Sequence, residues 1–226
     1  MVAPVRTLRK MDIEWLGTNY CKHGHTYLSH YDCFVKEAPD ASPFKERVGH
    51  FDIEASNLNA NFGYVFSYCI IDNDKKVLGR VLRPHEIRSG QFDSKLMAEL
   101  SADLRKFNRV VVHYGGDGRF DCPFVRTRSI KAGVDFPLYK EIYVSDTWRI
   151  SRNKLKLSSN RLETISKFFG IEAKNHPMNF DVWCHAMTGD KDSLQYIWDH
   201  NVEDCESLRQ VYNLLKPYTR LGKESF

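Results

Sequence analysis

The chain has 226 residues, a net charge of +4 and 42% hydrophobic residues, enough for one large domain with a small appendage. Its mean hydropathy is −0.48, and no apolar run approaches the roughly 20 residues that a membrane-spanning helix needs. The N-terminus carries basic residues without the apolar segment of a secretory signal. We therefore expect a soluble, cytoplasmic protein and no integral membrane protein.

Residues 1–46 form a Cys/His-rich segment, which we expect to be separate from a main domain at 47–226. Five possible N or S ligands fall within thirteen residues: Cys21, His23, His25, His30 and Cys33. Zinc takes four such ligands, and the spacing favours Cys21 with His25, or with His23 in its place, plus His30 with Cys33. We predict a structural zinc site that organises a segment without a core of its own.

Two other interpretations of this segment stay open. It is alternatively a loop that contacts nucleic acid, or it contains a Cys21–Cys33 disulfide, which a reducing compartment disfavours. The remaining cysteines lie inside predicted strands and helices, where we expect reduced thiols: Cys69, Cys122, Cys184 and Cys205.

The main domain begins with three predicted strands, at residues 47–55, 62–72 and 75–84, with Asn73 and Asp74 as turn residues between the last two. Apolar residues then recur at helical spacing over residues 93–107. These elements indicate an antiparallel meander followed by one amphipathic helix.

Strands and helices alternate in the second half. A strand is predicted at 109–115, a helix within 120–133 and a strand at 141–148. A capping box of Asn160 and Glu163 starts the next helix, which carries an apolar stripe including Phe168 and Phe169 and stops at Gly170, and a long helix spans 192–216. This order predicts an α/β or α+β domain with a mixed sheet flanked by helices, as in ribonuclease H-like proteins.

Acidic residues stand at three points of this pattern. Strand alternation places Asp52 and Glu54 on one face, where two carboxylates favour a hard divalent cation. Asp121 begins a helix after a Gly-rich turn, and His200 and Asp204 share one face of the last helix. Each motif alone has an ordinary alternative: surface chemistry for the first pair, an N-cap for Asp121, and a surface pair for the last two.

The order of these motifs, F-D-I-E, F-D-x-P-F and H-N-x-x-D-C-x-x-L, resembles the DEDD (DnaQ-like) 3′-5′ exonuclease superfamily over residues 47–217. The stretches 145–147 and 161–171 are also similar to that superfamily. The resemblance implies a ribonuclease H-like fold. It also implies two Mg²⁺ or Mn²⁺ ions held by the four acids, one beside the attacking water and one beside the departing 3′ oxygen.

The resemblance makes His200 the expected general base, with one departure from the superfamily. One of its branches has Tyr four residues before the last Asp, and the other has His five residues before it. Here His200 is at the four-residue spacing and Asp199 at five. One residue turns a helical side chain by about 100°, so the placement follows one branch and the chemistry the other.

Several further residues are tentative substrate contacts. Asn57, Leu58 and Phe62 follow the first acidic motif, where related enzymes seat the 3′-terminal base, with core packing as the alternative. His113, Tyr114 and Arg119 flank the Gly-rich turn. Asp146, at a predicted strand end, is either a supporting acid of the site or a structural residue.

We therefore expect a metal-dependent 3′-5′ exonuclease acting on single-stranded DNA or RNA. Residues 119–161 hold ten Lys or Arg against four Asp or Glu, a local charge of +6 that suits a polyanion. An endonuclease or processing nuclease on the same metal site is an alternative, and so is a non-catalytic nucleic-acid-binding zinc module. No motif distinguishes DNA from RNA.

Overall fold

The computed structural model describes residues 10–38, 46–171, 176–219 and 224–226. The chain divides into two compact units, Met1–Glu46 and Arg47–Phe226. No helix in the described ranges has the length and apolar character needed to cross a membrane.

The N-terminal unit contains two short helices, α1 (Lys10–Thr18) and α2 (Tyr31–Glu37), and an isolated bridge between Tyr20 and Thr26. Its buried residues form a small cluster of their own: Leu16, Cys21, Tyr27, Cys33 and Phe34. Trp15 stacks on Tyr27 with ring centroids 5.8 Å apart. The expectation that this segment lacks a core is therefore wrong, because Leu16 and the aromatic residues near the cysteines supply one.

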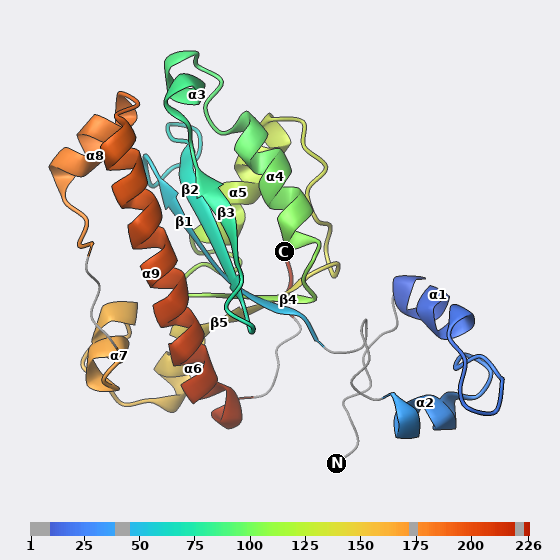
Figure 1. The fold of residues 1–226 in the computed structure, drawn as a ribbon. Coiled ribbons are helices and arrows are strands. Elements are labelled where there is room, and N and C mark those ends of the chain that lie inside the picture. Colours follow the sequence, from blue (N-terminus) through green and yellow to red (C-terminus); the bar gives the residue numbers. More distant parts are fainter. Residues whose placement is uncertain (1–9, 39–45, 172–175, 220–223) are drawn as a thin grey trace. The chain divides into compact units, whose positions relative to one another are not determined.

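The larger unit is built on a mixed sheet whose described strands lie in the order β3-β2-β1-β4-β5 (Figure 1). The antiparallel meander consists of β1 (Val48–Ala55), β2 (Val65–Asp72) and β3 (Val77–Val81). The parallel part adds β4 (Arg109–Val112) beside β1 and β5 (Tyr143–Asp146) beside β4. The carboxyl ends of β1, β4 and β5 therefore meet at one edge of the sheet.

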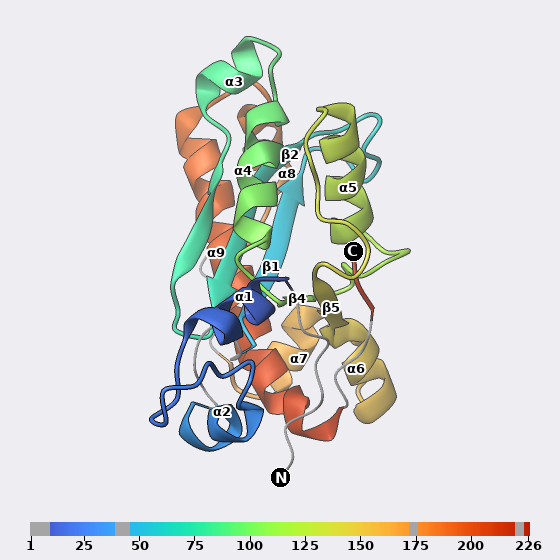
Figure 2. The ribbon, with the colours of Figure 1, turned by 90° about the vertical axis from the view of Figure 1, so that its right-hand side faces the viewer.

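Helices cover both faces of this sheet. Figures 1 and 2 show α4 (Ser94–Leu104) and α5 (Asp121–Lys131) on one face and the long α9 (Lys191–Leu215) on the other. The short α3 (Pro84–Arg88) precedes α4, and α9 continues into the 3₁₀ turn η1 (Lys216–Tyr218). The sequence between β5 and α9 forms α6 (Thr147–Lys154), α7 (Leu162–Phe168) and α8 (Phe180–Met187).

Successive side chains of β1 point to opposite faces of the sheet and take part in different clusters. Phe51 and Ile53 belong to the main hydrophobic core, together with Leu96 and Leu100 of α4. Val48 points the other way and packs with Leu208 and Tyr212 of α9. Asp52 and Glu54 share the side of Val48, so α9 crosses the face that carries the acidic residues.

Expectations about where β5 ends and how α7 begins were wrong. The strand predicted to reach Trp148 ends at Asp146, whose side chain accepts hydrogen bonds from the N–H groups of Trp148 and Arg149 and so starts α6. The capping box of Asn160 and Glu163 does not form, because Arg161 is the N-cap of α7 and has no side-chain cap.

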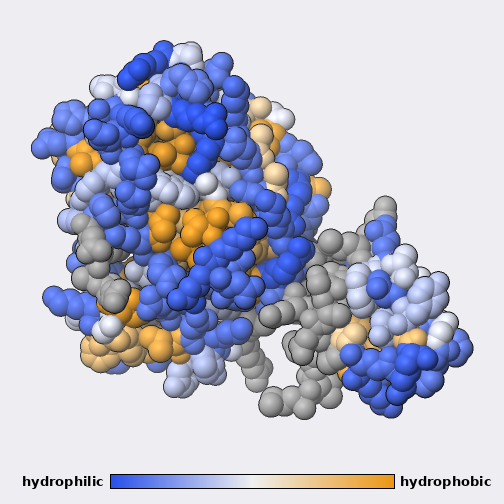
Figure 3. Space-filling view, in the orientation of Figure 1, coloured by the Kyte–Doolittle hydropathy of each residue, from blue (hydrophilic) through white to orange (hydrophobic). Residues whose placement is uncertain are grey.

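The apolar stripe predicted for α7 is also incomplete. Phe168 and Phe169 are exposed by 67% and 39%. Figure 3 shows hydrophobic surface over the region that α7 occupies in Figure 1.

Candidate functional site

The site is built where α9 crosses β1. Asp52 and Glu54 are half-buried, while Phe51 and Ile53 between and beside them are 0% and 4% exposed. In the antiparallel pairing, Asp52 lies opposite Cys69 and Glu54 opposite Ser67 of β2. The register changes directly after Glu54, where a bulge separates it from Ala55. This bulge ends the regular strand beside the acids, a common arrangement next to active sites.

His200 of α9 faces the acids through its Nε2 atom. This atom lies 3.4 Å from Oε1 of Glu54 and 3.5 Å from Oδ2 of Asp204. The ligand atoms of Glu54, His200 and Asp204 all lie within 4.8 Å of one another. Two carboxylates around an imidazole nitrogen form a group that can hold a divalent cation.

The other ring nitrogen of His200 lies 2.5 Å from the carbonyl oxygen of His176. A carbonyl oxygen only accepts, so Nδ1 carries a proton and donates it to this carbonyl, while Nε2 faces the carboxylates of Glu54 and Asp204. Glu203 holds the His176 segment, since its carboxylate accepts from the N–H of His176 at 3.1 Å and lies 2.8 Å from Nδ1 of that ring. Glu203 and His176 thus set the orientation of His200.

Asp52 is held by Asn201, which sequence reasoning missed. Nδ2 of Asn201 donates to Oδ2 of Asp52 at 2.7 Å, and its Oδ1 accepts from the Ser67 hydroxyl at 3.0 Å. Asn201 is 0% exposed. A signal was present in the sequence, because Asn201 interrupts the apolar stripe that continues through Ile197 and Cys205 at four-residue spacing.

Asp121, the first residue of α5, is 3% exposed, and Phe120 rather than Asp121 is the N-cap of that helix. Burial raises the pKa of the Asp121 carboxyl to about 7, and the charge of Asp146 adds to this rise. Hydrogen bonds from the backbone N–H groups of Asp121 and Ile53 act in the opposite direction. Since Ile53 stands between the two acids of β1, this bond ties Asp121 to the same strand.

The Gly-rich turn makes room for Asp121. A Cβ atom on Gly115 would lie 1.9 Å from Oδ2 of Asp121, and one on Gly116 would lie 3.2 Å from Oδ2 of Asp146. Asp146 accepts from the N–H groups of Tyr114 at 3.0 Å and Gly116 at 3.3 Å. Asp146 therefore fixes the turn that passes over Asp121, in addition to capping α6.

The structure does not place all four acids in one tight group. Among the described residues, the cluster within 4.8 Å contains Glu54 and Asp204 but neither Asp52 nor Asp121. Asp52 is connected to α9 by its hydrogen bond from Asn201, and Asp121 is connected to β1 by its hydrogen bond from the backbone N–H of Ile53.

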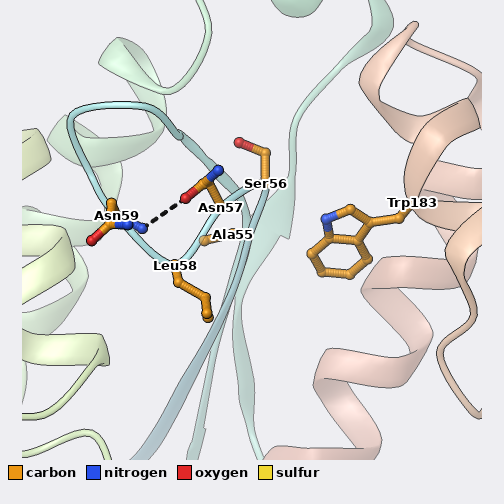
Figure 4. A pocket seen from close by; sticks show the side chains of 6 residues that line it. All are labelled: Ala55, Ser56, Asn57, Leu58, Asn59 and Trp183. Carbon is orange, nitrogen blue, oxygen red and sulfur yellow. Dashed lines mark hydrogen bonds between the residues drawn. The ribbon is translucent and has the colours of Figure 1, made fainter.

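An open hollow of about 470 Å³ lies beside the carboxyl end of β1. It is lined by Ala55, Ser56, Asn57, Leu58, Asn59 and Trp183, as Figure 4 shows. Oδ1 of Asn57 accepts from the N–H of Asn59 at 2.9 Å. Leu58 and Phe62 are 81% and 80% exposed, so the alternative that they pack in the core is excluded.

Of the predicted contacts at the Gly-rich turn, His113 is engaged within the protein. Its Nδ1 lies 2.9 Å from Oγ1 of Thr147, and its Nε2 lies 2.9 Å from the carbonyl oxygen of Asn160. Tyr114 and Arg119 are exposed.

The N-terminal unit brings four of the five predicted zinc ligands together. Cys21, His23, His30 and Cys33 have ligand atoms within 4.8 Å of one another, and all six cysteines of the chain are free. Sγ of Cys21 lies 3.5 Å from Nδ1 of His30, and Sγ of Cys33 lies 3.3 Å from Nδ1 of His23. His25 is not in this group, although its ring lies beside that of His30.

The two thiols of this cluster differ in acidity. Burial raises the pKa of Cys21, but hydrogen bonds from His30 and from neighbouring backbone N–H groups outweigh it and bring the pKa to about 6. The pKa of Cys33 is raised by burial and by its closeness to Cys21. A thiol that ionises this readily suits metal binding.

Comparisons with known proteins agree with this fold. A model of the RNase_H_2 family, of the RNase H superfamily, matches residues 50–216. No curated protein matches the chain. Among solved structures, the family B DNA polymerase from the hyperthermophilic archaeon Pyrobaculum calidifontis gives a TM-score of 0.62 at 15% identity, covering 79% of this chain and 26% of that chain. The expected ribonuclease H-like fold is confirmed.

Proposed function

The chain belongs to the RNase H superfamily, and on this basis we propose that it is a metal-dependent nuclease that removes nucleotides from the 3′ end of a single-stranded nucleic acid. The observation that carries this proposal is the grouping of Glu54, His200 and Asp204 within 4.8 Å. This group lies where α9 crosses the acidic strand.

The residues present fit a pair of divalent cations. Asp52, Glu54, Asp121 and Asp204 offer carboxylate oxygens, the ligands that Mg²⁺ and Mn²⁺ prefer. Like charges gathered at one site repel unless a cation lies between them. Bound cations would supply Lewis acidity and stabilise negative charge at the phosphate.

His200 is the proposed proton acceptor. Its Nδ1–H is held by the His176 carbonyl, and Nε2 of the neutral ring would take a proton from a water placed beside Glu54 and Asp204. A general base must lie within hydrogen-bond reach of that proton, directly or through one water. A water bound to these two carboxylates would lie close to Nε2, which is itself 3.4 and 3.5 Å from them.

The hollow beside β1 supports action at a strand end. Leu58 and Phe62 project into solvent on the segment after Glu54, where an unpaired terminal base can stack against them. An endonuclease acting through the same carboxylates is the second candidate.

Incubation with 3′- and 5′-labelled single-stranded DNA and RNA, in Mg²⁺, Mn²⁺ or EDTA, tests the proposal. We expect metal-dependent release of mononucleotides from the 3′ end. Internal cuts in a circular strand would favour the endonuclease, and no cleavage of any substrate would contradict both enzyme proposals and leave the non-catalytic binding module.

The role of His200 is tested with two variants. His200→Ala should lose most turnover and retain Mn²⁺ binding measured by calorimetry, whereas Asp52→Ala should lose both. A parallel loss of Mn²⁺ affinity in His200→Ala would make this residue a metal ligand rather than the base.

We also propose that Cys21, His23, His30 and Cys33 hold a structural Zn²⁺. Ligands at about 2.3 Å (S) and about 2.0 Å (N) in tetrahedral geometry are separated by roughly 3.5 Å. The S···N separations of 3.3 and 3.5 Å agree with this value. All four tetrahedral positions are taken by protein atoms, so such a site is closed to catalysis.

The zinc proposal has a matched control within the cluster. His23→Ala should lower the zinc content of purified protein, measured by elemental analysis, while His25→Ala should keep it. Equal zinc content in both variants would contradict the assignment of His23.

A further inference from the structure

A group of aromatic and cationic side chains stands next to the carboxylates. The guanidinium of Arg119 lies over two rings, 4.9 Å from the centroid of Tyr114 and 4.7 Å from that of Trp148. Arg152 also lies over Trp148, at 5.2 Å. The two rings meet edge to face with centroids 5.0 Å apart. We call these four residues the arginine platform.

The fold holds the platform beside the proposed active site. Tyr114 follows β4 and Trp148 follows β5, so both stand at the sheet edge where the carboxyl ends of the parallel strands meet. Oδ1 of Asp146 accepts from the N–H of Tyr114 at 3.0 Å and from that of Trp148 at 2.9 Å. One carboxylate therefore joins the two segments that carry the rings.

The platform is also directly connected to Asp121. Tyr114 precedes Gly115, over which the Asp121 carboxylate packs. The backbone of Tyr114 has φ +60°, a left-handed conformation that is uncommon for an aromatic residue. The hydrogen bond from its N–H to Asp146 helps to hold this conformation, in which the side chain is 45% exposed.

The platform arginines differ from their neighbours in charge pairing. Arg126 forms an ion pair with Asp117 at 3.2 Å, and Arg149 forms one with Glu224 at 2.6 Å. Among the described residues, no carboxylate lies within ion-pair distance of Arg119 or Arg152. Exposed cations without a described carboxylate partner continue along the same segment, namely Lys154, Lys156 and Arg161.

We propose that Arg119 and Arg152, held over the rings of Trp148 and Tyr114, bind two backbone phosphates of a single-stranded nucleic acid whose 3′ end reaches the carboxylates. This inference rests on the proposed function for the direction of the strand. Binding by the platform itself needs neither metal nor hydrolysis.

The chemistry of the platform favours phosphate. A guanidinium stacked on a ring still presents its N–H edge, whose fork geometry matches two phosphate oxygens. The hydroxyl of Tyr114 lies 3.5 Å from Nη1 of Arg119 and further restricts that side chain. Because the rings order both guanidinium groups before binding, less side-chain entropy is lost when a phosphate arrives. Contacts of this kind do not depend on base sequence.

The test measures binding of a fluorescein-labelled single-stranded oligonucleotide by anisotropy in EDTA, over a series of salt concentrations. In the wild type, the slope of log K against log salt reports the number of phosphate contacts. The double variant Arg119→Gln/Arg152→Gln should reduce that slope by about 1.4, at about 0.7 per phosphate. At about 0.1 M salt this corresponds to roughly 25-fold weaker binding.

The control is Arg126→Gln/Arg149→Gln, which removes the same charge from the same segment but from arginines that already have carboxylate partners. We expect its slope to stay close to that of the wild type. Equal slope changes in the two double variants, or no change in the platform variant, would overturn the proposal.

A third variant tests the ordering of the arginines by the ring separately from their charge. Trp148→Leu keeps both arginines and should weaken binding about fivefold or more with little change in slope. Wild-type affinity in this variant would contradict the role of the ring.

The carboxylate site is assayed separately. The substrate is thymidine 5′-p-nitrophenyl phosphate in Mn²⁺. Its hydrolysis needs the carboxylates, but this single nucleotide is too short to reach the platform. If the wild type hydrolyses this substrate but the double variant Arg119→Gln/Arg152→Gln shows no slope change, the platform proposal alone is overturned. If the wild type hydrolyses nothing but the double variant does show the slope change, the proposed function alone is overturned.

Discussion

Gly115 leaves no room for a side chain beside Asp121 in the proposed active site, and Gly115→Ala tests this packing. The new Cβ would lie 1.9 Å from Oδ2 of Asp121, whereas Cβ contacts below 3.0 Å are essentially never observed. The carboxylate oxygen must therefore retreat by at least about 1.1 Å, the difference between these two distances. Gly115 does not have a positive φ, so the backbone itself accepts alanine.

The expected cost follows from this displacement. A misplacement of about 1 Å in a catalytic constellation lowers the rate by about 100-fold, equivalent to about 2.7 kcal/mol of transition-state stabilisation. Stability should change little, because alanine also restricts the unfolded chain, by about 0.4–1 kcal/mol. We expect Gly115→Ala to fold and to cleave about 100-fold more slowly, as Asp121→Asn should.

The assay is single-turnover cleavage of a 3′-labelled strand in Mn²⁺, with Mn²⁺ affinity from calorimetry and folding from thermal melts. The control is Gly116→Ala, the same change one residue later. Its Cβ would meet Oε1 of Glu224 at 2.9 Å and Oδ2 of Asp146 at 3.2 Å, which are much less severe contacts. Wild-type cleavage and Mn²⁺ affinity in Gly115→Ala would refute the placement of Asp121 in the site.

Further predictions concern stability and the substrate hollow. Arg128→Met should lower the free energy of unfolding by about 3–5 kcal/mol in urea titrations, because its guanidinium makes two buried hydrogen bonds, of 2.8 and 2.6 Å, to the carboxylate of Asp93. Arg126→Met removes an exposed ion pair and should change the free energy of unfolding by less than about 1 kcal/mol. Asn201→Leu should weaken Mn²⁺ binding about 10- to 100-fold, because it removes the hydrogen bond that positions Asp52. Unchanged Mn²⁺ affinity would contradict this positioning role of Asn201. Phe62→Ala should raise KM while altering stability by no more than about 0.5 kcal/mol, whereas Phe51→Ala should cost about 3–5 kcal/mol; a comparable loss in both would place Phe62 in the core.

The sheet was readable from the sequence because its signals are local. The alternation in β1 already separates Phe51 and Ile53 from Asp52 and Glu54, since successive side chains of a strand point to opposite faces. The amphipathic pattern of residues 93–107 likewise anticipated α4. Resemblance to known exonucleases then related acids that lie far apart along the chain.

Element boundaries were less predictable where a side chain contacts backbone outside its own strand. Asp146 ends β5 and starts α6 by accepting from the first N–H groups of that helix, and it also holds the turn at Tyr114. From the sequence alone, the same residues continue a β-branched strand. The choice between strand and helix depended on these hydrogen bonds.

The sequence by itself determined the ligand types, namely carboxylates on a strand and a helix and thiols with imidazoles in the N-terminal unit. Only the tertiary structure decided which of them meet. It joined Asn201 to Asp52 across 149 positions and placed His23, rather than His25, in the cysteine cluster. The physical reason is that side-chain convergence depends on how distant backbone segments pack, which residue spacing along one element does not encode.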